Sequence, residues 1–558
     1  MRAKPTLLPS SDHTGWEGPM TMEEGNPQLD AAPTEETAFL DRRRFLRLSG
    51  GAVGLAVVAS QLPGAGALAK SPKQYPFTLG VASGDPLPDG VVLWSRLAPD
   101  PLVPSGGMPP RRVPVQWQVA TDEQFRSVVR RGTVVTLPEH AHSIHVDVRG
   151  LEPRREYFYR FKAGSEGSPV GRTRTAPPAG TIPARWAFAF ASCQNFPAGY
   201  YAAYRDMAQQ DLDLVVHLGD YIYEGPGHTG IRPHAPAKEI MSLEDYRVRH
   251  AQYKTDPHLQ AAHAAFPWLV TWDDHEFDNN YSADDTDPNM EPAAMLARRA
   301  AAYQAYWEHM PLRLSQRPSG AHLPLYRELP MGDLVQFHVL DTRQYRSDQT
   351  NCSGEGITGG YCPSARDPNR TLLGGEQKQW LLEGLDRSPA RWNVLAQQII
   401  FAQKDNAPAL DTQNYVGNGD QWDGYKADRD SILDFIQRRQ PSNPVVITGD
   451  VHRSFVYDLK ADFADTASPT IGTEFVGTSI TSGGDPRAGF TTRYRGQPND
   501  PHEVFYDDHR GYVRCSLTPK RWQADYRAVA TSVLDPNAPV TTVASFVVED
   551  GQPGAQPA

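Results

Sequence analysis

Six side chains that could bind metal ions or move protons follow apolar segments with the pattern of buried strands. They stand just after residues 212–218, 268–272 and 445–448 and are Asp220, Tyr223, Asp274, His275, Asp450 and His452. One aspartate after a strand is ordinary, because Asp closes turns and caps helices. Three strand ends that all carry such groups are harder to explain in this way, and α/β sheets place their ligands at strand ends. The sequence therefore predicts a reactive site at one edge of a sheet.

The donor types in this set indicate which cations it would hold. Carboxylates, a phenol and a few imidazoles suit Ca²⁺, Mn²⁺, Mg²⁺ or ferric iron better than a tetrahedral structural zinc. A site with several such ions polarises a phosphoryl group and generates hydroxide. The expected reaction is hydrolysis of a phosphoric ester, in which a metal-activated hydroxide or oxo group attacks phosphorus in line. No covalent phosphoenzyme is expected, because no serine or threonine occupies the centre of these motifs.

Further segments complete an α/β pattern. Residues 186–191, 334–340 and 394–400 read as strands, and helical periodicity runs through 243–265 and 295–308. Strands that alternate with helices and end in polar clusters are typical of α/β sheets that carry a ligand site.

Arg343 follows one of these strands and is predicted to hold the substrate phosphate. A guanidinium fork matches the oxygens of a phosphate group. A salt bridge from Arg343 to Asp341 or Asp348 is the alternative, and the sequence leaves both open.

The segment before this pattern has strand character. Apolar clusters alternate with Gly, Pro and Asp turn signals over 77–97, 113–119 and 133–137. The sequence from Gly150 to Pro153, followed by the Tyr-rich segment 157–161, resembles a corner of a fibronectin type III sandwich. The expected organisation is an export signal over 1–69, an N-terminal β-sandwich domain over 70–180, a catalytic domain over 181–549 and a disordered tail over 550–558.

Four motifs together resemble the PhoD-type alkaline phosphatases, relatives of the purple acid phosphatases within the calcineurin-like metallophosphatase fold. The motifs are Ser192-Cys193-Gln194, Gly219-Asp220-Tyr221-Ile222-Tyr223-Glu224, Trp272-Asp273-Asp274-His275-Glu276 and Gly449-Asp450-Val451-His452. The resemblance covers about 75–548. It implies an α/β fold with a four-layer αββα sandwich, preceded by an N-terminal fibronectin-like β-sandwich.

The same resemblance implies a centre of ferric iron (Fe³⁺) and calcium (Ca²⁺), with two calcium ions expected. Cys193, Asp220 and Tyr223 would bind the iron, and Asp220 would bridge to a neighbouring metal. The Asp-x-x-Tyr spacing matches the iron-binding motif of purple acid phosphatases, and a phenolate is a suitable hard ligand for Fe³⁺.

The remaining roles are also carried over from the family. Asp274 is expected to be a metal ligand and His275 a catalytic histidine, while Asp450 and His452 complete the metal set. A further calcium ligand is expected at Asn279 or Asn280, with Asn280 preferred. The sequence itself does not choose between the two asparagines.

The chain begins with features of an export signal. A basic run over 41–47 precedes an apolar stretch over 50–62 and the cleavage-type sequence Ala67-Leu68-Ala69. The pair Arg42-Arg43 resembles the twin-arginine signal, which makes the twin-arginine translocase an expected partner. The apolar stretch is too short to span a bilayer, so no transmembrane anchor is expected, although an anchor is the alternative. We expect an exported protein that is secreted, periplasmic or associated with the cell wall, and either Met20 or Met22 could be the true start.

Four cysteines are too few to form a disulfide scaffold in a chain of 558 residues. Cys352 and Cys362 flank a short Gly-rich loop, so export favours a disulfide between them. Cys193 at a strand end is expected to be a thiolate ligand, with a bridge to Cys515 as its alternative. Cys515 itself lies in an alternating strand and is expected to be a buried apolar residue.

Composition excludes one large class of partner. A net charge of −11 and a pI near 5.9 remove the basic surface that a general nucleic-acid binder needs, so no stable nucleic-acid complex is expected. The expected substrates are small phosphate esters. A phosphodiesterase or a phospholipase D-like enzyme with the same metals is the close alternative, acting on phosphodiesters such as phospholipid or cell-wall polymer. A secreted binding protein without activity is the remote one.

Overall fold

The computed structural model describes residues 75–227, 230–283, 290–350, 352–406, 413–486, 489–494 and 499–558. The predicted export signal, with Arg42 and Arg43, lies outside the described residues. The chain divides into two units, Met1–Arg47 and Leu48–Ala558, and everything described below belongs to the second. Among the described residues, no helix has both the length and the apolar character needed to cross a membrane.

A ten-stranded sheet forms one half of the structure. Its central strands β9, β10, β11 and β1 run parallel, and antiparallel strands extend it on both sides. In order across the sheet, the strands are β23 (Gln552–Pro557), β22 (Val540–Glu549), β21 (Arg521–Val529), β20 (Gly511–Leu517), β9 (Trp186–Ala191), β10 (Leu214–His217), β11 (Pro267–Val270), β1 (Val81–Leu87), β2 (Gly90–Arg96) and β5 (Ser143–Arg149).

An eight-stranded sheet forms the other half. Its strands β13, β14, β15 and β17 are parallel to one another. In order, the strands are β12 (Arg327–Met331), β13 (Val335–Val339), β14 (Trp392–Ala396), β15 (Pro444–Thr448), β17 (Thr470–Val476), β16 (Ser454–Lys460), β19 (Glu503–Asp507) and β18 (Thr492–Tyr494).

The two sheets pack face to face because their central strands are apolar on both sides. Successive side chains of a strand point to opposite faces. On β9, Phe188 and Phe190 enter the core between the sheets, where the ring of Phe188 lies 5.3 Å from that of Phe337, while Ala189 and Ala191 face the helices outside. On β15, Ile447 enters the same core, and its neighbour Val446 faces the other helices.

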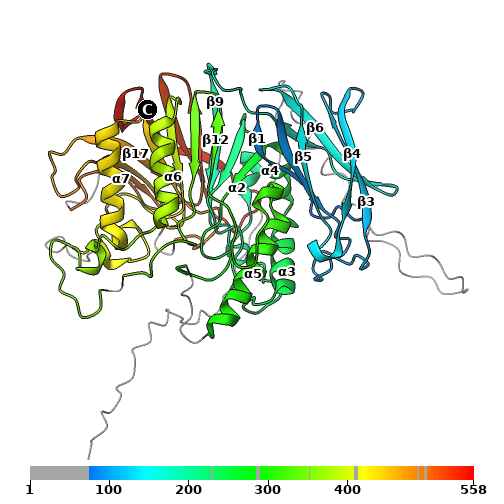
Figure 1. Ribbon diagram of the computed structural model, residues 1–558, viewed down its shortest axis with the longest axis horizontal. Coiled ribbons are helices and arrows are strands. Elements are labelled where there is room, and N and C mark those ends of the chain that lie inside the picture. The colour runs from blue at the N-terminus through cyan, green and yellow to red at the C-terminus, as the bar shows by residue number, and fades with distance from the viewer. Residues whose placement is uncertain are drawn as a thin grey trace, which may run out of the picture. The chain divides into compact units, whose positions relative to one another are not determined.

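Helices cover both outer faces. Four pack on the ten-stranded sheet: α2 (Ala202–Met207), α3 (Leu243–Lys254), α4 (Pro257–Ala265) and α5 (Pro292–His309). Two pack on the eight-stranded sheet: α6 (Gly374–Arg387) and α7 (Lys426–Arg439), which lie side by side in Figure 1. The order of layers is therefore helices, sheet, sheet, helices, and the predicted α/β class is confirmed.

The N-terminal segment differs from its prediction as a separate sandwich. Five strands form a small sheet of their own: β3 (Val113–Ala120), β4 (Val128–Thr136), β6 (Glu156–Ala163), β7 (Glu166–Gly167) and β8 (Gly171–Arg174). The sheet that faces it across a shared core is the β1, β2 and β5 end of the ten-stranded sheet, where Ser83 of β1 pairs with Pro267 of β11. Strands β1, β2 and β5 therefore belong to the ten-stranded sheet although they precede the linker near residue 180. Apolar alternation tells which face of a strand is buried, but not which strand it pairs with.

The predicted disorder of residues 550–558 is wrong. The segment contains β23, which pairs with β22 through Phe546 and Pro557. Ala555 is buried against the core between the sheets. The composition of this segment is poor in apolar residues, but backbone pairing with an existing edge strand orders it without a large apolar contribution of its own.

The structure contains the disulfide that the short loop between Cys352 and Cys362 predicts. Cys352 and Cys362 form a disulfide, with their Cα atoms 5.7 Å apart. Cys193 and Cys515 are free and buried, so the alternative bridge between them is absent.

Peptide mapping under non-reducing conditions is expected to find the peptides of Cys352 and Cys362 linked by a disulfide. Replacing Cys362 with Ser should lower the free energy of unfolding by about 2–3 kcal/mol, because the opened loop gains freedom in the unfolded chain. Urea unfolding with and without reductant measures this effect. The reductant should destabilise the wild type and leave the variant unchanged. Free thiols at both positions in oxidised protein would refute the pairing.

Candidate metal centre

Four predicted metal ligands converge at one edge of the two sheets. The Cys193 sulfur, an Asp220 carboxylate oxygen and a His452 ring nitrogen all lie within 4.8 Å of one another. The Tyr223 hydroxyl donates to Asp220 Oδ2 at 2.7 Å and lies 3.3 Å from His452 Nε2. These residues follow β9, β10 and β15, so the carboxyl ends of parallel strands meet as the sequence predicted.

The backbone at these positions adopts an uncommon conformation. Cys193, Asp220, Asp450 and His452 have φ values of 57°, 55°, 62° and 54°, in the left-handed region that non-glycine residues rarely occupy. Each such residue costs on the order of 1–3 kcal/mol, and such strain clusters at functional sites. Gly219 has a φ of 111°, and a Cβ there would lie 2.5 Å from the Asp273 nitrogen. The chain therefore bends sharply at each strand end and turns these side chains toward one point.

Two further carboxylate groupings adjoin the first. Asp220, Asp274 and His275 form one, and Asp273, Asp274 and Asp450 form the other, with ligand atoms within 4.8 Å in each. Asp220 belongs to two groupings, and so does Asp274. Shared carboxylates of this kind can bridge neighbouring cations, which fits a site for more than one ion.

Burial makes it energetically unfavourable to keep these clustered carboxylates ionised when no cation is bound. It raises the pKa values of Asp220 and Asp273 well above their usual range and that of Asp450 to about 7. Burial also acts to raise the pKa of Asp274, but Arg343, His275 and the Asn280 N–H hold it well below its usual value. The site therefore favours either protonated acids or bound cations.

Two buried carboxylate oxygens favour bound cations over protonated acids. Among the described residues, Asp220 Oδ1 and Asp273 Oδ2 accept no hydrogen bond although both are buried. Buried polar atoms are normally paired, and a bound ion is one explanation for an exception. The donor set of carboxylates, thiol, phenol and imidazole therefore fits a polynuclear metal centre.

The thiol and the phenol would change state when an ion binds. Burial and the nearby Asp220 raise the pKa values of Cys193 and Tyr223 well above their usual range. Both groups are thus protonated as the chain stands. A cation reverses this balance, because a metal ligand must release its proton.

His275 stands beside this group with a fixed orientation. Its Nδ1 lies 2.7 Å from Glu224 Oε2, and its ring packs against that of Tyr223 at 4.1 Å. Burial acts to lower its pKa, but Glu224, Asp220 and Asp274 outweigh this and raise the pKa well above its usual value. The surrounding carboxylates therefore favour the charged form of the His275 ring.

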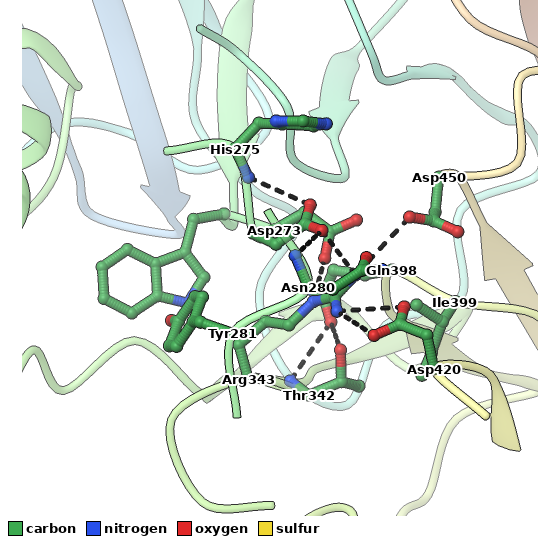
Figure 2. A network of polar contacts seen from close by, with 12 residues as sticks. Asp273, His275, Asn280, Tyr281, Thr342, Arg343, Gln398, Ile399, Asp420 and Asp450 are labelled. Carbon is green, nitrogen blue, oxygen red and sulfur yellow. Dashed lines mark hydrogen bonds and ion pairs between the residues drawn. The ribbon is translucent and has the colours of Figure 1, made fainter. Parts of the chain in front are cut away.

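Arg343 does not have the position that a phosphate clamp requires. Its side chain is 0% exposed, and it contacts four carboxylates (Figure 2). The Nε bonds to Asp273, Nη1 donates to both oxygens of Asp420 at 2.8 and 3.0 Å, and Nη2 lies 3.6 Å from Asp274 and 3.5 Å from Asp450.

The alternative prediction for Arg343 was a salt bridge to Asp341 or Asp348. Arg343 does form salt bridges, but with other aspartates. Asp341 accepts the backbone N–H of Arg343 at 3.0 Å, and the guanidinium pairs with neither Asp341 nor Asp348. Because the strand end is buried under the acidic cluster, the guanidinium is enclosed by carboxylates and no longer free to clamp a substrate.

The two asparagines contribute through their backbones. The Asn280 N–H donates to Asp274 Oδ2 at 2.6 Å, and its carbonyl accepts from Arg346 at 3.0 Å. The Asn279 N–H donates to Glu224 Oε1 at 3.1 Å. Both residues are exposed at the rim of the site. A calcium-binding role for either side chain stays a prediction.

Sequence reasoning missed several supporting residues. Glu276 accepts the backbone N–H groups of Asp220 and Asp273 at 3.0 and 2.8 Å, which ties two ligand loops together. Glu276 belongs to the same motif as Asp274, and this position could have indicated a supporting role. Asp420 binds Arg343 and Arg346 from a distant loop, and nothing in its sequence context indicates that role.

A cavity of about 290 Å³ opens beside Asp450 and His452. Gln421 lines it and donates to Asp450 Oδ2 at 2.8 Å. Two of the candidate metal ligands, Asp450 and His452, therefore line this cavity.

Comparison with known proteins extends this description. The family model of the PhoD-like phosphatase matches residues 188–526, and that of the PhoD-like phosphatase N-terminal domain matches residues 62–177. Alkaline phosphatase D of Bacillus subtilis (strain 168) is 52% identical over 529 residues, which cover 92% of this chain and 88% of that protein. A solved structure of PhoD superposes with a TM-score of 0.82 at 52% identity and covers 88% of this chain and 93% of that one.

Proposed function

Because this chain belongs to the PhoD-like phosphatase family and is a phosphoric ester hydrolase, we propose that it cleaves its substrate at a centre of ferric iron and calcium. The observation that carries the proposal is the convergence of Cys193, Asp220, Tyr223 and His452 on one point. We further propose that the helix, sheet, sheet, helix layers are those of the calcineurin-like metallophosphatase fold.

The donor types support a division of the ions. The phenol, thiol, imidazole and bridging carboxylate suit Fe³⁺, whereas Asp274 and Asp450 offer the oxygen ligands that Ca²⁺ prefers. When bound, such ions polarise the phosphoryl group and neutralise charge that builds up on its oxygens.

The protein's own groups prepare this chemistry. His275, held by Glu224, can donate a proton to the oxygen of the leaving group. Arg343 compensates the charge of the surrounding carboxylates and fixes their orientation. Ser482 lies 2.7 Å from both the Tyr223 hydroxyl and the Cys193 carbonyl, and this position suits orienting the ligands.

Export is part of the proposal. The segment that carries Arg42-Arg43 is proposed to direct the folded enzyme through the twin-arginine translocase. Export after folding would allow the metal centre to assemble before transport. The enzyme would then act outside the cytoplasm, in the periplasm, at the cell wall or in the medium.

Turnover of three substrates tests the proposed function. We expect metal-loaded protein to hydrolyse p-nitrophenyl phosphate or its bis ester, and phosphatidylcholine is the third substrate. Comparing kcat/KM shows whether a phosphomonoesterase, a phosphodiesterase or a phospholipase D-like activity dominates. The same protein after removal of metals is the control and should be inactive. Absence of turnover on all three substrates with the metals in place would contradict the proposal.

A further inference from the structure

The cavity beside the metal ligands carries two cationic side chains that the chemistry above does not use. Lys404 and Arg453 both line it, and Arg453 directly follows His452. The remaining lining residues are Ile400, Asn406, Asn418, Gln421, Asp423, Asp450, Val451, His452 and Phe455. The cavity wall therefore combines two cationic side chains with two aspartates, a histidine, and amide and apolar groups.

Among the described residues, neither cation forms an ion pair with a carboxylate. Within the same ranges, Arg453 makes no hydrogen bond and is exposed. The hydrogen bonds that the described residues offer Lys404 Nζ go to neutral oxygens, the Asp405 carbonyl at 3.4 Å and Asn406 Oδ1 at 3.1 Å. Arg343 and Arg429, by contrast, are each paired with an aspartate.

The acids of the cavity are already engaged elsewhere. Asp423 accepts from Arg429 at 2.6 Å and from the Tyr361 hydroxyl at 2.7 Å. Asp450 accepts from Gln421 and faces the metal ligands. Asp500 and Glu503 lie near enough to Lys404 for its charge to oppose the rise of their pKa values, so they balance that charge in part. The two cations still face a concave site, where low-dielectric walls strengthen their attraction for an anion.

We propose that Lys404 and Arg453 form an anion subsite that binds a second, non-reacting phosphate group of the substrate. This inference rests on the proposed function and deepens it. The preferred substrates would be phosphoric esters with another anionic group close to the ester that is cleaved. A guanidinium fork and an ammonium together match the oxygens of such a phosphate. Since the contact lies away from the reacting phosphorus, it lowers KM more than it raises kcat.

A matched pair of substrates tests the subsite. Thymidine 3'-(4-nitrophenyl phosphate) and its 5'-phosphorylated counterpart release the same nitrophenol and differ by one phosphate. The wild type should show a kcat/KM about tenfold higher for the phosphorylated probe, mainly through KM, as expected for charge-assisted hydrogen bonds. The advantage should fall as salt is raised, because exposed charges are screened.

Variants then assign the effect to the two residues. Lys404→Met with Arg453→Met should abolish the preference for the phosphorylated probe and leave turnover of the other probe within about twofold. Arg453→Lys keeps the charge and should retain part of the preference. Lys520→Met removes an exposed lysine that does not line the cavity, and should behave as the wild type.

Three outcomes would contradict either the anion subsite or the proposed function. Equal kcat/KM for both probes in the wild type, or a preference that survives in the double variant, would overturn the subsite. No turnover of either probe, together with no turnover of p-nitrophenyl phosphate, would contradict the proposed function instead. Calorimetric binding of the two probes to the wild type and the double variant then still decides the subsite.

Discussion

Replacing Asp220 with Asn is expected to lower kcat/KM by at least about three orders of magnitude, since metal ions supply several kcal/mol of transition-state stabilisation. Asp220 belongs to two of the three ligand groupings and holds the Tyr223 hydroxyl at 2.7 Å. The amide keeps the size of the side chain and removes its charge, so two neighbouring cations would lose a shared neutralising ligand. Steady-state kinetics with elemental analysis of the same samples measures both consequences.

Asp386→Asn is a suitable control for this substitution. Asp386 lies near the end of α6, where it forms an exposed ion pair with Arg439 and belongs to none of the ligand groupings. Its kcat/KM should stay within about twofold of the wild type, because exposed ion pairs contribute little. Metal content and turnover of Asp220→Asn within tenfold of the wild type would refute the bridging role.

Replacing Arg343 with Met is expected to destabilise the fold by about 3–5 kcal/mol, the usual effect of leaving buried charges without their partner. The fully buried guanidinium contacts Asp273, Asp274, Asp420 and Asp450. Arg343→Lys should recover only part of the lost stability, because an ammonium cannot reproduce the forked contacts. Chemical denaturation in the presence of the metals gives the free energies of unfolding.

A surface arginine provides the comparison for Arg343. Arg439→Met breaks the exposed pair with Asp386 and should cost less than about 1 kcal/mol. The kinetics separate the two roles considered for Arg343. A phosphate clamp predicts a raised KM and an unchanged free energy of unfolding in Arg343→Met, and that result would contradict the structural role.

The location of the site could be predicted from the sequence because it depends on strand ends. Apolar segments followed by Asp220, Asp274 and Asp450 indicate parallel strands, whose carboxyl ends meet at one edge. Strand segments that alternate with the helical segments 243–265 and 295–308 likewise indicated the α/β class. Both patterns involve residues close together in the sequence, so a single sequence is enough to recognise them.

The remaining features depend on contacts that no local pattern records. Asp420 lies 77 residues from Arg343, and its pairing with that guanidinium follows from the packing of a distant loop. The left-handed backbone of Cys193 is imposed by the surrounding structure, since a cysteine does not favour it. The pairing of β1 with β11 and of β23 with β22 depends on neighbouring strands. Strand and turn patterns alone had indicated a separate sandwich, and composition had indicated a disordered tail.

The visible spectrum of the purified protein tests the iron assignment most directly. A phenolate on ferric iron produces a ligand-to-metal charge-transfer band, so the wild type should be coloured and contain iron and calcium by elemental analysis. Tyr223→Phe keeps the ring that packs on His275 but removes the hydroxyl, so the band should weaken or shift and iron occupancy should fall. A colourless wild type that contains only zinc, together with unchanged turnover in Tyr223→Phe, would contradict the proposed iron centre.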